Sequence, residues 1–328
     1  MFLIILLFYL AKVTTGQHDA TDWSYGDILR VTSQNLQIRD GDVTPSDVNL
    51  YLYSRKNPDE PIWLNSNENY NVKLRHGTKI AIHGFLGNYQ ERFLIDIKNE
   101  FLKVNDFNII LVDWERVAKS YYISAARNTR LIGDIIADFL IRHKIPPTRL
   151  HLIGFSLGSH IAAFAAKKIK LLTSQQVERI TGLDPAGPYF RMERITENER
   201  LSVNDAKIVD VVHTDGGIFG YLKPIGSLDM YVNGGVRKQP GCKDGEPSLN
   251  RKQMIINAMC SHKRSCEYFI ESIAKANITC KMCDSYEDIA IEECQEDNTI
   301  TIINQNVTES MQGICTFSTS ESEPFLTI

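Results

Sequence analysis

Apolar, β-branched segments that alternate with segments of helical periodicity constrain the fold of this chain most strongly. The apolar segments are residues 78–85, 107–114, 150–156, 177–184 and 206–214. Nearly continuous apolar runs are typical of strands buried on both faces of a parallel sheet, because each crossover places a helix over a face. The alternation therefore predicts an α/β fold with a mostly parallel central sheet and helices on both faces.

Helical periodicity is clearest in residues 125–143, where the apolar side chains recur at steps of one to four residues and form one stripe. Two prolines, Pro146 and Pro147, predict where that helix ends. The alanine-rich segment after Ser156 ends in lysines, which suit a helix C-terminus. Both segments are therefore expected to form helices that connect neighbouring strands.

The chain opens with the apolar stretch MFLIILLFYLA, which is followed by Lys12 and small residues. It is shorter than the roughly 20 residues that span a bilayer, so we interpret residues 1–16 as a cleaved signal peptide, with a buried N-terminal helix as the alternative. No internal repeat or low-complexity tract follows. We expect residues 17–328 to form a single domain, with an edge strand at 48–58 and a final strand pair within 299–320.

The charges of the chain are nearly balanced. It has 36 Lys and Arg and 40 Asp and Glu, a net charge of −4, with no long run of either sign. A nucleic-acid partner would call for a clustered basic surface, so the composition argues against one.

All seven cysteines fall after residue 241, at 242, 260, 266, 280, 283, 294 and 315. Clustered cysteines of this kind are typical of local disulfides in a secreted protein, and the glycosylation sequons at Asn277 and Asn306 agree with that compartment. Cys280 and Cys283 have the spacing of a zinc or redox pair, but no second such pair accompanies them. We therefore expect disulfides and an extracellular location.

Ser156 lies in the pattern Gly154-x-Ser156-x-Gly158, directly after an apolar run and directly before a helical one. This is the pattern of a strand-to-helix turn that exposes a nucleophilic serine above a sheet. Glycine and serine are common residues, so the pattern alone is weak and needs partners.

A serine hydroxyl needs a histidine base, which is itself oriented by a carboxylate. Three histidines follow Ser156 in the chain: His160, His213 and His262. His160 is one turn further along the same predicted helix, and His213 ends a strand. We predict His262 as the base, in a loop next to Cys260 and before a helix.

Asp184 is predicted as the acid, because it closes a predicted strand and enters the rigid turn Pro-Ala-Gly-Pro. Asp205, Asp210 and Asp215 are the alternatives. The oxyanion formed on attack needs two N–H donors, which we expect from the backbone of Leu157 and of Phe85. A plain strand-exit turn is the alternative interpretation of the segment around Phe85.

Several stretches together resemble the pancreatic-lipase-like secreted lipases and phospholipases A1 of animals. They are IHGFLGN, VDW, HLIGFSLGSHIA, GLDPAGPYF, DAKIVDVVHTDGG, DMYVNGGVRKQPGC and CSHKRS with YFIESI, in that order. The resemblance covers about residues 45–328. It implies an α/β-hydrolase fold, a catalytic triad of Ser156, Asp184 and His262, and an oxyanion hole at Phe85 and Leu157.

The resemblance also implies a pairing for some of the cysteines. Cys242 and Cys260 would be joined and close a lid loop, residues 243–259, and Cys283 would pair with Cys294. A bond between Cys266 and Cys280 is our remaining expectation, which leaves Cys315 without a partner.

A structural calcium site is implied at Glu197, Arg200, Ser202 and Asp205, but Ser202 stands where the family has a carboxylate. We expect no required cofactor. The family's C-terminal β-sandwich is not expected in this chain either.

Two surface loops bear on the substrate, because short versions go with phospholipase A1 activity in the resembled family. The first loop, 217–228, has 12 residues and the second, 243–259, has 17. These lengths lead us to expect a phospholipase A1 acting at a lipid surface, with a triacylglycerol lipase as the alternative. A non-catalytic lipid binder, similar to yolk proteins, is the alternative from another class.

Overall fold

The computed structural model describes residues 42–65, 77–244, 246, 253, 257–274, 277–295, 297–303 and 306–326. The predicted signal peptide and much of the segment 243–259 lie outside these residues. Within them, no helix is long and apolar enough to cross a membrane.

Eleven strands form one sheet in the described part of the chain. They are β1 (Asn49–Ser54), β2 (Asn57–Asn65), β3 (Thr78–Ile82), β4 (Asn108–Asp113), β5 (Leu150–Phe155), β6 (Val177–Leu183), β7 (Ala206–His213), β8 (Leu228–Val232), β9 (Asn277–Cys283), β10 (Thr299–Ile303) and β11 (Gly313–Phe317). The α-helices are α3 (Arg92–Val104), α4 (Glu115–Ala118), α5 (Tyr122–Arg142), α6 (Leu157–Thr173), α8 (Cys260–Ala274) and α9 (Tyr286–Ala290).

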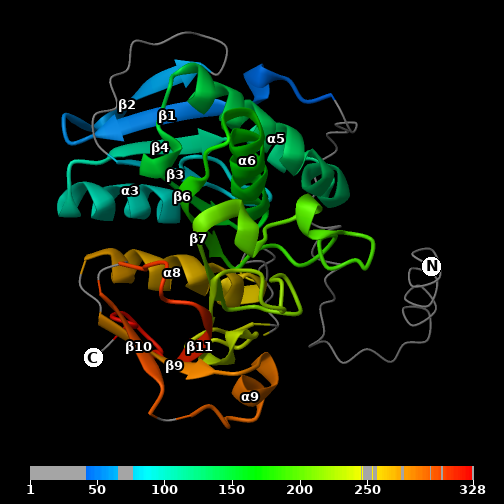
Figure 1. The fold of residues 1–328 in the computed structure, drawn as a ribbon, viewed down its shortest axis with the longest axis vertical. Helices are drawn as coiled ribbons and strands as arrows, with labels where there is room; N and C mark the ends of the chain where they lie inside the picture. Colours follow the sequence, from blue (N-terminus) through cyan, green and yellow to red (C-terminus); the bar gives the residue numbers. More distant parts are fainter. Residues whose placement is uncertain are drawn as a thin grey trace.

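The strand order is β10-β9-β11-β8-β7-β6-β5-β3-β4-β1-β2, and the sheet runs through the whole molecule in Figure 1. The seven neighbouring strands β11, β8, β7, β6, β5, β3 and β4 pair in parallel. The pairs at the two ends are antiparallel: β1 with β2 and β4, and β9 with β10 and β11. The five strands expected from the apolar segments are β3 to β7, so the mostly parallel sheet is confirmed.

Two expectations at the ends of the sheet are wrong. The strand expected at the edge, β1, pairs with both β4 and β2, so β2 forms the edge. The two strands expected to pair with each other, β10 and β11, are separated by β9. The local sequence pattern does not show which strands pair with each other, because long-range packing selects the partner of each strand.

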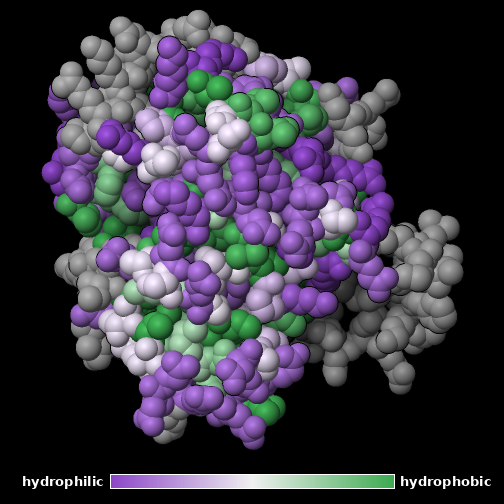
Figure 2. All heavy atoms as spheres, in the orientation of Figure 1, coloured by the Kyte–Doolittle hydropathy of each residue, from purple (hydrophilic) through white to green (hydrophobic). Residues whose placement is uncertain are grey.

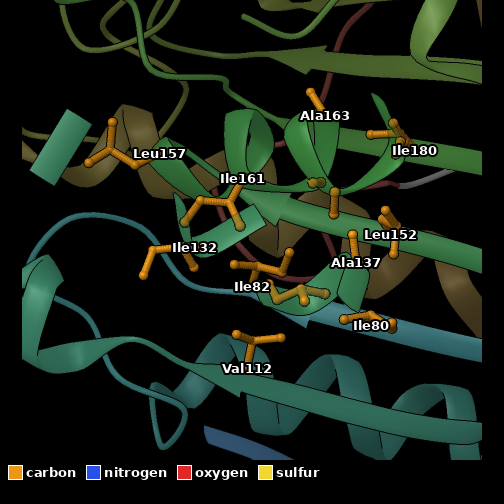
Figure 3. Packing of buried hydrophobic residues seen from close by; sticks show 14 of the residues in the cluster. Ile80, Ile82, Val112, Ile132, Ala137, Leu152, Leu157, Ile161, Ala163 and Ile180 are labelled. Atoms are coloured by element: carbon orange, nitrogen blue, oxygen red, sulfur yellow. The ribbon is translucent and has the colours of Figure 1, made fainter. Parts of the chain in front are cut away.

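Helices cover both faces of the sheet, as the sequence predicts. On one face, Ile80, Ile82 and Leu152 pack against α5 and α6, and Figure 3 shows these side chains meeting Ile132 and Ile161. Alternate residues of the same strands pack on the other face against α3 and α8. The surface in the view of Figure 2 is mostly hydrophilic, with apolar side chains scattered over it.

The disulfides lie at the β9–β11 end of the sheet and beside α8. Cys242 is bonded to Cys260 and Cys283 to Cys294, as expected. The expected bond between Cys266 and Cys280 is wrong. Cys280 is bonded instead to Cys315, with 5.6 Å between their Cα atoms. The two residues lie on the neighbouring strands β9 and β11, which only the sheet topology brings together, whereas Cys266 is a free thiol buried in α8.

Candidate active site

The parallel strands place several segments of distant sequence at one edge of the sheet. Ile82 of β3 is in register with Gly154 of β5, Gly154 with Gly182 of β6, and Leu183 with Val212 of β7. The carboxyl ends of these strands therefore meet, and ligands of open α/β sheets bind at this edge.

Ser156 occupies the turn between β5 and α6 with φ 55° and ψ −118°, a strained conformation for a residue with a side chain. The flanking glycines make the turn possible. A Cβ on Gly154 would lie 2.3 Å from the backbone of Gly158, and one on Gly158 would lie 2.3 Å from the carbonyl oxygen of Ile82. The spacing Gly-x-Ser-x-Gly thus forms the sharp strand-to-helix turn that the sequence predicts.

His262 and Asp184 meet at the same edge, although 78 residues separate them. Nδ1 of His262 lies 2.5 Å from Oδ2 of Asp184, and both side chains are buried. The other oxygen of Asp184 accepts hydrogen bonds from the backbone N–H of Thr214, at 3.0 Å, and of Asp215, at 3.2 Å. These bonds fix the carboxylate, which in turn orients the imidazole ring and favours a proton on Nδ1.

The expected loop position of His262 is wrong, since α8 begins at Cys260 and His262 lies in its first turn. Two hydrogen bonds hold the start of the helix. The backbone N–H of Ser261 donates to Asp244 at 3.2 Å, and the hydroxyl of Ser261 donates to the same carboxylate at 2.5 Å. The disulfide from Cys260 to Cys242 adds a covalent tie. The imidazole is therefore placed by a rigid element.

Aromatic rings flank the imidazole of His262. The ring of Phe155 is 4.6 Å away and that of Phe219 is 5.6 Å away, measured between centroids. The structure gives no hydrogen bond between Oγ of Ser156 and His262. In free enzymes such bonds are often long and tighten only when substrate is bound.

The turn that carries Phe85 lies against Ser156, because a Cβ on Gly84 would lie 2.9 Å from Cβ of Ser156. His83 holds this turn in place. Its Nδ1 lies 2.9 Å from the carbonyl oxygen of Gly84, and its Nε2 accepts a hydrogen bond of 3.1 Å from the backbone N–H of Trp114. The indole N–H of Trp114 returns a hydrogen bond of 2.9 Å to the carbonyl oxygen of His83.

Sequence reasoning assigned no role to His83 or Trp114. Both stand in stretches that carry the family resemblance, IHGFLGN and VDW, and this was the available signal. Their mutual hydrogen bonds join the ends of two neighbouring parallel strands, β3 and β4, and so brace the turn at Phe85.

The two alternative histidines are used in packing. His160 accepts a hydrogen bond of 3.1 Å from the backbone N–H of Leu201, and its Nε2 lies 2.9 Å from the carbonyl oxygen of Ala186. Burial lowers the pKa of His160 to about 3, so it stays neutral at physiological pH. Nε2 of His213 lies 2.8 Å from Oδ1 of Asp229, and its Nδ1 lies 2.9 Å from the carbonyl oxygen of Tyr221.

Among the alternative acids, Asp210 forms a two-pronged ion pair with Arg179, with distances of 2.7 and 2.8 Å. Asp215 is different. One carboxylate oxygen of Asp184, one of Asp215 and one ring nitrogen of His262 all lie within 4.8 Å of one another. Burial raises the pKa of Asp215 to about 6, against the lowering effect of Arg237. Sequence reasoning considered Asp215 only as an alternative to Asp184, whereas the structure places both carboxylates beside the imidazole.

The residues expected around a calcium ion are a poor fit to one. The carboxylate of Asp205 is paired with the ammonium of Lys167. It also accepts a hydrogen bond of 2.8 Å from the backbone N–H of Ser202. Glu197 is exposed, and the side chain of Arg200 is a cation. Calcium takes six to eight oxygen ligands, several of them anionic. This set offers two carboxylates, of which Asp205 is already paired with a cation and Glu197 lies at an exposed position.

The chain is similar in sequence to several known proteins. A family model described as Lipase matches residues 12–325. The chain is 35% identical over 257 residues to lipase member H of Oryctolagus cuniculus, covering 76% of this chain and 54% of that protein. It is 33% identical over 278 residues to pancreatic triacylglycerol lipase of Cavia porcellus, covering 76% and 57%.

Among solved structures, an α/β-superfamily hydrolase of Xanthomonas campestris aligns with a TM-score of 0.33 and 16% identity, covering 44% of this chain and 76% of that one. The chain spans a little over half the length of the two curated relatives.

Proposed function

This chain belongs to the lipase family, and on that premise we propose that it hydrolyses carboxylic acyl esters of glycerolipids. The proposal assigns Ser156 as nucleophile, His262 as general base and acid, and Asp184 as the residue that orients His262. It rests above all on the 2.5 Å contact of His262 with Asp184 next to the strained turn at Ser156.

In the first half of the reaction, Oγ of Ser156 attacks the ester carbonyl carbon and its proton passes to Nε2 of His262. The negative charge on the carbonyl oxygen is stabilised by the backbone N–H groups of Phe85 and Leu157. The C–O bond to the leaving alcohol breaks, and His262 returns the proton to that alcohol. An acyl ester of Ser156 remains.

In the second half, His262 takes a proton from a water molecule, which attacks the acyl carbon. The bond to Oγ of Ser156 then breaks, His262 protonates Oγ, and a free fatty acid leaves. Asp184 stays ionised throughout and stabilises the imidazolium that forms in each half.

We infer that the substrate is a phospholipid and the enzyme a phospholipase A1. The loop 217–228, whose Phe219 lies against His262, is short, and short versions of this loop go with phospholipase A1 activity in the resembled family. A triacylglycerol lipase is the second candidate, favoured by the similarity to pancreatic triacylglycerol lipase. Both act on lipid surfaces. The protein is proposed to work outside the cell, which three disulfides and the exposed sequon residues Asn277 and Asn306 support.

Two substrates distinguish these candidates. Purified protein is incubated with phosphatidylcholine that carries different acyl chains at its two positions, and separately with triolein. Release of the chain from the first position of the phospholipid supports phospholipase A1, and release of oleate from triolein supports the alternative.

Activity on neither lipid would contradict both candidates and favour a non-catalytic lipid binder. A serine-reactive phosphonate tests that outcome directly, because an enzyme becomes labelled at Ser156 and a binder does not. In Ser156→Ala we expect loss of labelling and a fall in turnover of about 10⁶-fold, with an unchanged circular dichroism spectrum.

A further inference from the structure

We propose that Arg237 is a positioning residue that neutralises Asp215 beside the Asp184 and His262 pair and so sets the pH range over which His262 can act as a base. The inference rests on the proposed function of His262. It adds a second ion pair to the site, formed by two residues that have no role in the proposed mechanism.

The geometry of the pair is specific. Nε of Arg237 donates to Oδ1 of Asp215 and Nη2 donates to Oδ2, both at 2.9 Å. Asp215 is completely buried, and the side chain of Arg237 is 21% exposed. A two-pronged guanidinium and carboxylate pair of this kind fixes both partners and favours the charged form of the carboxylate, against the burial that raises its pKa.

The charges around the imidazole explain why such a pair is needed. His262 on α8 is faced by Asp184 at the end of β6 and by Asp215 after β7, and Arg237 faces both carboxylates from the loop after β8. Asp244, at the base of the lid segment, also acts on Arg237. Without the cation, the group formed by Asp184, Asp215 and His262 would bind a proton more tightly, and the free base would be available only at higher pH.

Arg237 also contacts the end of the lid segment. Its Nη2 donates a hydrogen bond of 3.2 Å to the carbonyl oxygen of Ala258, and its guanidinium lies 4.9 Å over the ring of Phe219. That ring packs against Ala258 and against the imidazole of His262. The same guanidinium therefore contacts Asp215, the end of the lid segment at Ala258 and the ring of Phe219 that packs against His262.

The test is the pH dependence of kcat/KM on a soluble short-chain p-nitrophenyl ester, which avoids any effect of a lipid surface. In Arg237→Gln we expect the acid limb of the profile to move up by about one pH unit, with turnover retained on the alkaline plateau. At pH values below the limb this is a fall of about tenfold. Arg237→Lys keeps the charge and should restore most of the wild-type profile.

Lys238→Gln is the matched control, because it removes a positive charge from the neighbouring exposed residue and should leave the profile unchanged. A uniform loss of activity at every pH in Arg237→Gln, with the limb unmoved, would overturn the proposal and indicate a purely structural role.

A second measurement covers the outcome in which Arg237→Gln does not fold. Asp215→Asn removes the opposite charge, so its acid limb should move down, and the charge-balanced double variant Arg237→Gln with Asp215→Asn should return close to the wild-type limb. A limb that is unmoved in Asp215→Asn contradicts the proposal. Absence of ester hydrolysis and phosphonate labelling in the wild-type protein would instead contradict the proposed function.

Discussion

Two buried clusters beside the strands β5 to β7 each contain an imidazole with aspartate and arginine. At the strand ends, His262 lies with Asp184, Asp215 and Arg237. Further back along the same strands, His151 lies with Lys79, Thr181, Arg179 and Asp210. Each cluster combines an imidazole, an aspartate and an arginine, yet only the first is suited to acid–base catalysis.

The difference lies in which charge faces the imidazole. His151 lies 3.3 Å from Nζ of Lys79 and bonds to the hydroxyl of Thr181 at 2.7 Å, while Asp210 is paired with Arg179 instead. Burial and the two cations lower the pKa of His151 well below its ordinary value. His262 is faced by carboxylates, which can stabilise the imidazolium that catalysis needs. The charge that faces the imidazole therefore separates the proposed catalytic cluster from the structural one.

The largest difference between the two clusters is expected in the effect of one mutation on activity. Asp184→Asn should lower kcat by about 10⁴-fold, because a neutral amide no longer orients the imidazole or stabilises its charged form. Asp210→Asn makes the same chemical change in the other cluster and should leave kcat of the folded protein within a few fold. Equal losses in both variants would contradict the assignment of the two clusters.

Stability should respond in the opposite order. Asp210→Asn leaves the guanidinium of Arg179 buried without its carboxylate, and we expect the free energy of unfolding to fall by about 3–5 kcal/mol. Denaturation in urea measures this change. A smaller loss in Asp210→Asn than in Asp184→Asn would indicate that the cluster at the strand ends is the more important one for folding.

A change beside Asp184 tests how closely the catalytic cluster is positioned. A Cβ on Gly220 would lie 2.4 Å from Oδ1 of Asp184, so Gly220→Ala must displace the carboxylate. A shift of about 1 Å costs up to about 10²-fold in rate, and we expect a loss of 10- to 100-fold in kcat/KM. Gly77→Ala is the control, because its Cβ would meet Phe107 at an ordinary 3.5 Å. An unchanged rate in Gly220→Ala would show that the carboxylate tolerates displacement.

The pH dependence of the free energy of unfolding tests the cluster that contains His151 and Lys79. Burial lowers the pKa of Lys79 from 10.5 to about 8. Below pH 8 the lysine is charged in both the folded and the unfolded chain. Between pH 8 and 10.5 Lys79 is mostly neutral in the folded chain but still protonated in the unfolded chain. Because the unfolded chain binds more protons in this range, the free energy of unfolding rises with pH.

We expect Lys79 to contribute about 3 kcal/mol to this rise, and Lys79→Met should remove that part of it. Thermal denaturation between pH 7 and 10.5 measures the difference, with the exposed Lys56→Met as control. Parallel curves for wild type and Lys79→Met would contradict the role of Lys79.

The smallest effect is expected from removing metal ions. Asp205 is paired with Lys167, as Asp210 is paired with Arg179, so its charge is already neutralised by the chain itself. Incubation with EDTA should leave both the melting temperature and the rate of ester hydrolysis unchanged. A lower melting temperature that added calcium restores would show that the ion pair does not replace a metal.

Much of the fold could be predicted because the signals are local. The apolar runs of β3 to β7 and the apolar stripe of α5 are properties of contiguous residues. The turn at Ser156 was also predictable, because two glycines two residues away from the serine are what its close backbone contacts require. Failures occurred where the partner lies far away in sequence, as with Cys280 and Cys315.

The sequence by itself determined the type of fold, the strained turn at Ser156 and the short set of histidines and aspartates from which its partners could come. Tertiary structure alone decided their arrangement. Register between parallel strands brings Asp215 next to Asp184 and leaves Asp210 with Arg179, and packing of α8 places His262 between two carboxylates. Charge acts through space over a few ångströms, and those distances are set by packing between distant segments, which no local pattern of residues records.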